Sequence, residues 1–100
     1  MFEDFRLKVF ITVAKTGSFT KASKHLGISQ PAVSQNISAL EKETGATLIS
    51  RNRGEATLTS QGVVFLEYAE KIQYWYSAAA GMFRRSGSKR PFRLFWPAMA

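Results

Sequence analysis

Amide and hydroxyl side chains recur between residues 29 and 42. The apolar positions Val33, Ile37 and Leu40 are spaced as i, i+4 and i+7, which predicts a helix with one buried side. The side chains left on the outer side are Gln30, Pro31, Ser34, Gln35, Ser38 and Lys42. Glutamine and serine donate and accept hydrogen bonds, and glutamine can pair with adenine through two of them in the major groove. The pattern is typical of a helix that reads bases, although a merely solvated polar face has the same spacing.

Groups suited to phosphate lie on either side of this helix. Thr20 and Lys21 stand at the start of the preceding helical segment, where free backbone N–H groups attract anions. Arg51 and Arg53 belong to a predicted hairpin, from which they can reach a flanking phosphate or a minor groove. A solvated turn is the alternative interpretation of these two arginines.

Catalytic and metal-binding chemistry has little support. The chain has no cysteine, one histidine (His25) and one aspartate (Asp4), and it lacks a glycine loop that could cradle phosphate. No nucleophile with a base and no cluster of metal ligands can be assembled from this set. We therefore expect no enzymatic activity, no metal site and no cofactor.

The composition suggests one small domain with an appendage. The chain has 100 residues and a net charge of +7, which favours nucleic acid as a partner, but five of its basic residues lie beyond residue 83. Glu3 and Asp4 stand where a secretory signal would be basic and apolar, and the longest apolar run, residues 63–66, is too short to span a bilayer. We expect a cytoplasmic protein with no membrane partner.

Capping residues predict three helices, over about residues 4–15, 19–26 and 30–43. Asp4, Ser18 and Ser29 stand at N-cap positions, and Gly27 supplies the left-handed turn between the second and third helices. These signals predict a helix-turn-helix over about residues 19–38.

Two short alternating runs follow, residues 46–51 and 56–58, on either side of Asn52-Arg53-Gly54-Glu55. Asparagine and glycine favour turns, so the runs predict a β-hairpin. The expected fold class is mainly α: a winged helix-turn-helix of three helices plus a short β-hairpin in residues 1–59, followed by a long dimerisation helix.

The long helix is predicted over residues 60–85, with Thr59 as its N-cap. Its apolar stripe has spacings of 3, 4, 3, 4 and 3 residues and consists of Phe65, Tyr68, Ile72, Trp75, Ala79 and Met82. This repeat is typical of a helix that packs lengthwise against another helix. About 24 residues form a rod of roughly 36 Å, longer than the preceding domain can cover. We expect a homodimer through this helix, with an intramolecular core as the alternative.

A resemblance to the DNA-binding domain of LysR-type transcriptional regulators rests on G-S-F-T-K-A-S-K-H-L-G-I-S-Q-P-A-V-S-Q-N-I-S-A-L-E, residues 17–41. Residues 48–51 and 58–62 resemble the same family's wing and the start of its linker helix, and the match covers about residues 7–76. It implies a dimer that binds partly palindromic double-stranded DNA and regulates transcription. The implied reading residues are Gln30, Pro31, Ser34 and Gln35, and the implied supporting contacts come from Thr20, Ser29, Ser38 and Arg53.

Two departures from the family pattern are visible. Ile49 stands where the family usually has phenylalanine. Such regulators also continue into a larger ligand-binding domain. In the tail 86–100 of this chain, residues 92–94 resemble the first strand of that domain. The chain is then a fragment or a natural short form, and a small-molecule effector is expected only if the missing domain exists. A winged-helix adaptor that binds proteins without reading DNA, and a short competitor of a full-length regulator, remain alternatives.

Overall fold

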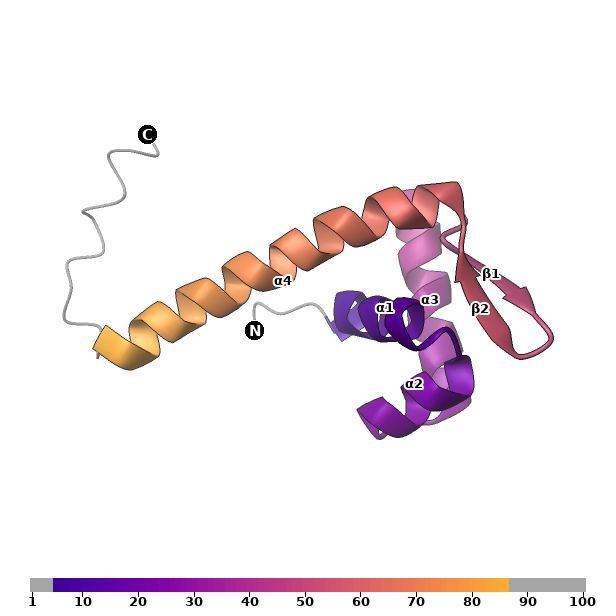
Figure 1. Cartoon of the computed structure of the whole chain (residues 1–100), viewed down its shortest axis with the longest axis horizontal. Helices are drawn as coiled ribbons and strands as arrows, with labels where there is room; N and C mark the ends of the chain where they lie inside the picture. The colour runs from indigo at the N-terminus through magenta and orange to yellow at the C-terminus, as the bar shows by residue number, and fades with distance from the viewer. Residues whose placement is uncertain (1–4, 87–100) are drawn as a thin grey trace.

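The computed structural model describes residues 5–86, with side chains over residues 5–82. Its elements, in chain order, are α1 (Phe5–Thr16), α2 (Phe19–Leu26), α3 (Gln30–Thr44), β1 (Ile49–Asn52), β2 (Glu55–Leu58) and α4 (Ser60–Ser86). Figure 1 shows α1, α2 and α3 gathered into one body with the hairpin on its flank, and α4 leaving that body as a long rod. The predicted winged helix-turn-helix followed by a long helix is confirmed. Asp4 and residues 87–100, including the strand-like segment 92–94, lie outside the described residues.

The predicted caps form as expected around α2 and α3. The hydroxyl of Ser18 accepts the N–H of Lys21 at 3.1 Å, and that of Ser29 accepts the N–H of Ala32 at 3.2 Å. Gly27 closes α2 with φ of 71°, a conformation that a Cβ would strain. Local signals of this kind placed the limits of α2 at the predicted residues.

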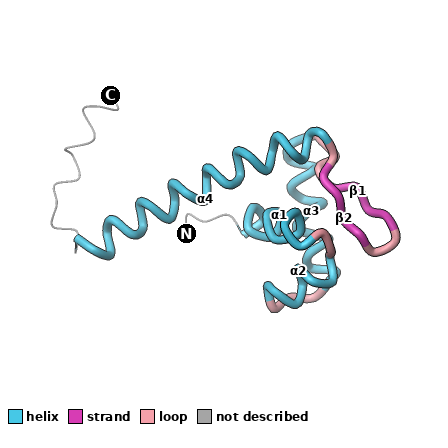
Figure 2. The backbone as a smooth tube through the Cα atoms, viewed as in Figure 1, coloured by secondary structure: helices cyan, strands magenta, loops and turns pink. Residues whose placement is uncertain are grey.

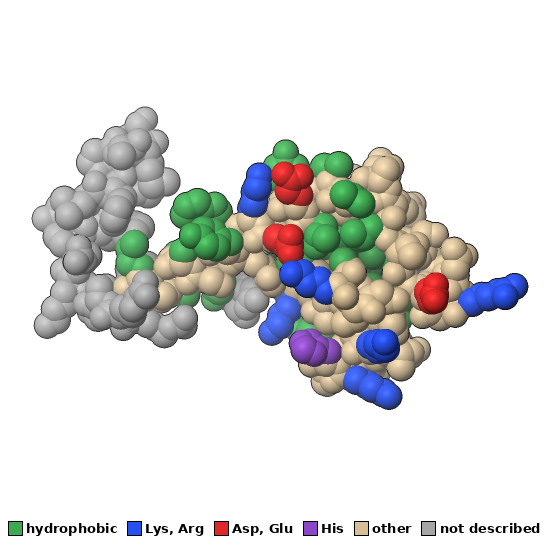
Figure 3. Space-filling model, in the orientation of Figure 1, with side chains coloured by type: hydrophobic (Ala, Val, Ile, Leu, Met, Phe, Trp, Pro, Cys, Tyr) green, Lys and Arg blue, Asp and Glu red, His purple; other side chains and the backbone are tan. Residues whose placement is uncertain are grey.

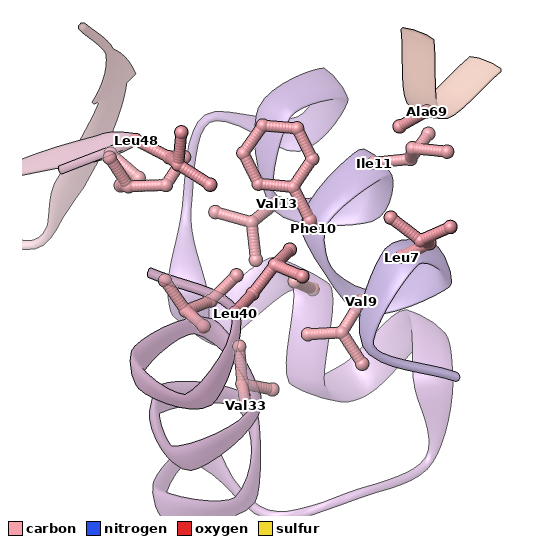
Figure 4. Close-up of a cluster of buried hydrophobic side chains, with 13 residues drawn as sticks. Leu7, Val9, Phe10, Ile11, Val13, Val33, Leu40, Leu48 and Ala69 are labelled. Atoms are coloured by element: carbon pink, nitrogen blue, oxygen red, sulfur yellow. The ribbon is translucent and has the colours of Figure 1, made fainter. Parts of the chain in front are cut away.

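The core lies between α1 and α3, with smaller contributions from the other elements. Its largest fully buried side chains are Phe10, Ile37, Leu48, Val9, Val13 and Val33. Figure 4 shows Val9 and Val13 of α1 on the side of Val33 and Leu40 of α3, and Ile11 on the side of Ala69. Leu48, just before the wing, lies at the opposite edge of the cluster. Because α3 buries this side against α1, its opposite side stays outward.

The predicted start of the first strand is wrong, and the other strand limits lie within one residue of the prediction. The first strand was expected over residues 46–51 but begins at Ile49, and the second begins at Glu55, one residue early. The N–H groups of Leu48 and Ile49 donate instead to the carboxylate of Glu41, at 2.7 and 3.1 Å. This tertiary contact, which an alternating pattern cannot reveal, occupies the backbone ahead of the strand.

The hairpin turn is also tighter than predicted. Asn52 pairs with Glu55, which leaves only Arg53 and Gly54 in the turn, at φ of 50° and 85°. Positive φ at both positions belongs to the two-residue turns that match the twist of paired strands. The hairpin docks on the α1–α2 turn, where the N–H of Ala56 donates to the carbonyl of Gly17 at 3.0 Å.

The predicted stripe on α4 divides into two parts. Phe65 packs edge-on against Phe10 of α1, with ring centroids 5.3 Å apart, so it belongs to its own domain. Farther along, Tyr68, Ile72 and Trp75 are 57%, 52% and 67% exposed. Ala79 and Met82 are exposed as well. The intramolecular alternative therefore applies to Phe65. Figure 2 shows that α4 itself continues past the body. Across the described part of the chain, every helix is too short or too polar to cross a bilayer.

Gly62 lies in the first turns of α4, directly against the wing. A Cβ built at this position would be 2.1 Å from the carbonyl oxygen of Leu48, whereas one built at Gly81 of the same helix would meet nothing within 4 Å. We expect Gly62→Ala to lower the free energy of unfolding by about 1–3 kcal/mol, because backbone has to move. Gly81→Ala is expected to raise it by about 0.5–1 kcal/mol.

Urea unfolding of the two variants and the parent chain, followed by circular dichroism, measures both changes. Equal stability of the two alanine variants would contradict the close approach of α4 to Leu48.

Candidate nucleic-acid interface

The helix-turn-helix presents one side of α3 outward. Buried Ala22 and Ser23 let α2 approach closely, and the N–H of Ile28 donates to the carbonyl of Ser23 at 3.1 Å, which fixes the turn between the helices. On the outer side of α3, the residues predicted to face away are exposed at Gln30, Pro31, Gln35, Ser38 and Lys42, and Ser34 is half-buried. The predicted reading side is thus accessible along nearly its whole length.

Two of the predicted site residues bind each other. The side-chain amide of Gln30 donates to the hydroxyl of Thr20, so the first turn of α3 is joined to the first turn of α2. Ser29 lies at the same end, where its hydroxyl is already engaged as the N-cap. Thr20 and Gln30 therefore form one connected polar patch, in which the amide oxygen of Gln30 can still accept a hydrogen bond.

The two wing arginines differ in their surroundings. The guanidinium of Arg51 lies over the ring of Phe19, 4.2 Å from its centroid, a cation–π contact that attaches the wing to α2. Arg53 stands at the hairpin tip and is exposed. The sequence suggested similar roles for both, but Arg51 has a partner within the fold.

An open hollow separates the hairpin from the start of α2. Its lining residues come from two segments and are Thr16, Gly17, Ser18, Lys21, Arg53, Gly54, Glu55, Ala56 and Thr57. Lys21 and Arg53, predicted separately as phosphate-binding residues, border the same hollow because the hairpin docks on the α1–α2 turn. Glu55, which also lines the hollow, supplies an opposing charge there. Figure 3 shows Lys and Arg side chains spread over this face of the body, including the hairpin.

Glu41 is the structurally important residue that sequence reasoning missed. It accepts the N–H groups of Leu48 and Ile49 and so joins the last turns of α3 to the wing. An acidic residue in the last turns of a helix opposes the helix dipole. That unfavourable position was the available signal that this carboxylate has another partner.

Residues 5–86 contain no candidate metal site, since no three side chains of His, Cys, Asp or Glu come together there. His25 is exposed near the end of α2. The chemistry that this surface offers is hydrogen bonding from neutral polar side chains, with cations at its margin.

Comparison with known proteins identifies the family. A family model described as "Bacterial regulatory helix-turn-helix protein, lysR family" matches residues 5–63. The chain belongs to this family. An uncharacterized HTH-type transcriptional regulator of Bacillus subtilis, YcgK, is 52% identical over 60 residues, which are 60% of this chain and 18% of that protein. An uncharacterized HTH-type transcriptional regulator of Methanocaldococcus jannaschii is 51% identical over 65 residues, 65% of this chain and 22% of that protein.

Solved structures of LysR-family proteins share the fold. The CbnR DNA-binding domain, crystallised in complex with DNA, matches with a TM-score of 0.79 and 34% identity, over 85% of this chain and 98% of that domain. CbnR, described as a LysR family transcriptional regulator, matches with a TM-score of 0.77 and 35% identity over 82% of this chain and 28% of CbnR. This LysR-family chain spans about a fifth of the length of the curated relatives it matches. Its relatives are regulators and not enzymes, in agreement with the expectation from the sequence.

The role of Glu41 in holding the wing can be measured. Glu41→Ala removes the acceptor for two backbone N–H groups, and we expect it to lower the free energy of unfolding by about 1–3 kcal/mol. Glu41→Gln keeps one oxygen acceptor and is expected to have an intermediate effect. Amide hydrogen exchange should accelerate at Leu48 and Ile49 in the alanine variant.

Glu43 provides the matched control, because within residues 5–86 its carboxylate makes only an exposed ion pair with Arg6, 2.9 Å long. Glu43→Ala is expected to change stability by less than about 1 kcal/mol, as exposed pairs do. Unchanged exchange at Leu48 and Ile49 in Glu41→Ala would show that the carboxylate does not hold the wing.

Proposed function

We propose that this chain binds double-stranded DNA sequence-specifically, as the DNA-binding module of a transcriptional regulator. The observation that carries the proposal is the exposed row of amide and hydroxyl groups on α3, opposite the side that α3 buries in the core. A row of this kind suits base edges in the major groove. Further support comes from the CbnR DNA-binding domain, which was crystallised with DNA and of which nearly the whole length matches this chain. Because its target would be chromosomal DNA, we propose that it acts in the cytoplasm.

The proposed roles follow the surroundings of each side chain. Gln30, Pro31, Ser34 and Gln35 would read bases. The supporting contacts would come from Thr20, Lys21, Ser29, Ser38, Arg51 and Arg53. Gln30 would use its amide oxygen, since its amide nitrogen is bonded to Thr20, and Arg51 would contact a phosphate while stacked on Phe19. Lys21 and Arg53, on either side of one hollow, would face the same stretch of DNA backbone.

We further propose that the chain forms a homodimer through α4 and binds a partly palindromic site. The exposed stripe supports this assembly, because each large apolar side chain gains about 1.5–3 kcal/mol when it is buried. Tyr68, Ile72, Trp75, Ala79 and Met82 would form the contact, and Phe65 would anchor α4 to its own domain. In this division, residues 1–59 bind DNA and residues 60–85 dimerise.

Base reading by α3 predicts a difference between two substitutions. Gln35 is exposed, and its side chain makes no hydrogen bond to any residue within 5–86, so Gln35→Ala should leave the fold intact. We expect it to reduce the difference in binding free energy between specific and non-specific duplexes by about 1–3 kcal/mol. Arg53→Ala should weaken binding to all sequences alike and reduce the slope of log affinity against log salt by about 1.

Fluorescence anisotropy with selected and scrambled duplexes, over a series of salt concentrations, measures both quantities. Identical behaviour of the two variants across sequences would show that α3 does not read bases. Absence of any sequence preference in the parent chain would favour the protein-binding adaptor.

Dimerisation through α4 predicts that a charge within the stripe separates the subunits. Ile72→Glu places a carboxylate on the exposed stripe, and we expect the dimer dissociation constant to rise at least about tenfold, since 1.4 kcal/mol corresponds to a factor of ten. Ser77→Glu adds the same charge at an exposed position two residues from both Trp75 and Ala79, hence on another side of α4, and should leave the constant within about twofold.

Sedimentation velocity over a range of protein concentrations gives the dissociation constant for each variant. Equal constants for Ile72→Glu and Ser77→Glu would place the dimer contact elsewhere.

A further inference from the structure

The crossing between α1 and α4 is close and made by few side chains. Phe65 meets Phe10 edge-on at 78°, and one turn later Ala69 is completely buried. Ala69 belongs to the same buried cluster as Leu7 and Ile11 of α1, and Figure 4 shows it facing Ile11. Glu70 then binds Lys15 of α1 at 2.8 Å. These three contacts define the direction in which α4 leaves the domain.

Ala69 determines how closely the two helices approach. Its methyl group is the smallest side chain in this crossing, and with 0% exposure it leaves no room for a larger one. The neighbouring contacts on α4 can adjust, because the Lys15–Glu70 pair is an exposed ion pair and Phe65 is only half-buried. A larger side chain at position 69 has to push α4 away from α1 while the start of α4 stays attached to the wing.

The N-terminal end of α4, its root, is attached to the segment before the wing independently of the crossing with α1. The N–H of Thr59 donates to the carbonyl of Leu48 at 3.0 Å, and the N–H of Gly62 donates to the hydroxyl of Thr59 at 2.9 Å. A push at Ala69 therefore tilts α4 about its root. From its first residue to its last, α4 is about 40 Å long, so a tilt of about 5° moves its far end by roughly 3–4 Å. One base pair of DNA is about 3.4 Å long.

We propose that Ala69 is a specificity-determining residue that never touches DNA: by setting the α1–α4 angle, it sets the half-site spacing that the dimer prefers. The proposal rests on the proposed function, because it requires two DNA-binding domains joined through α4. In such a dimer the exposed stripes hold the two α4 helices together, and each recognition helix is carried by its own crossing. A change in the crossing angle then changes the distance and rotation between the two recognition helices.

The test measures, for the full chain and its variants, how affinity depends on the spacer between two half-sites; we call this dependence the spacing profile. Duplexes selected from a random pool with the parent chain supply the half-site, which is then placed in a series whose spacer changes by one base pair at a time. Ala69→Leu enlarges the crossing, Ala69→Gly removes its only methyl contact, and Glu70→Gln removes the ion pair with Lys15. The matched control is Ala78→Leu, the same enlargement at an exposed position of the same helix. Circular dichroism and sedimentation report folding and dimerisation.

We expect Ala69→Leu to shift the preferred spacer by about one base pair, because the far end of α4 moves by about the length of one base pair. Affinity at the parent spacing should fall at least about tenfold. Affinity for a duplex with a single half-site should stay within about twofold, because the reading side of α3 is untouched. Ala69→Gly and Glu70→Gln should broaden the profile, and Ala78→Leu should reproduce that of the parent chain.

Folded, dimeric Ala69→Gly and Ala69→Leu chains with the parent profile would overturn the proposal. If Ala69→Leu does not fold, the profile of Ala69→Gly decides: an unchanged profile overturns the proposal, and a broadened one supports it. A parent chain with no sequence preference would refute the proposed function itself, a result different from unchanged spacing in chains that do bind.

Discussion

The peptide groups around Leu48 connect the three working parts of this molecule. The N–H of Leu48 donates to Glu41 at the end of α3, and its carbonyl accepts the N–H of Thr59 at the start of α4. The same carbonyl lies where any side chain at Gly62 would collide with it, and the Leu48 side chain is buried in the core. Helix α3, the hairpin and the start of α4 therefore meet at one short stretch of backbone, and contacts with that stretch position each of them.

Neutral and charged groups occupy different places on the candidate interface. The outer side of α3 carries mainly amides and hydroxyls, with Lys42 near its C-terminal end, whereas Lys21 and Arg53 lie around the hollow beside the hairpin. Neutral groups that both donate and accept hydrogen bonds can distinguish one base from another, while cations attract any phosphate equally. In the proposed complex with DNA, this arrangement would separate sequence discrimination from general attraction.

Most of the helical structure could be predicted from local chemistry. Ser18, Ser29 and Gly27 act within a few residues of their own position, so their roles are visible in the sequence, and the periodicity of α3 gave its outward side. The start of β1 could not be predicted, because Glu41 reaches it from another element. The spacing along the α4 stripe is uniform, so it cannot distinguish Phe65, which packs against Phe10, from the later members, which are exposed. Lys21 and Arg53 came together only because the hairpin docks on the α1–α2 turn, a contact between segments more than 30 residues apart in sequence.

Arg53 occupies a backbone conformation that suits glycine or asparagine better than a long side chain. Its φ of 50° is the left-handed region, where a residue with a Cβ is less stable by about 1–2 kcal/mol. Replacement by glycine would relieve that strain and at the same time remove the cation from the hairpin tip. Fold stability and attraction for an anionic partner thus pull in opposite directions at this one position, and a sequence optimised for heat resistance alone would not keep an arginine there.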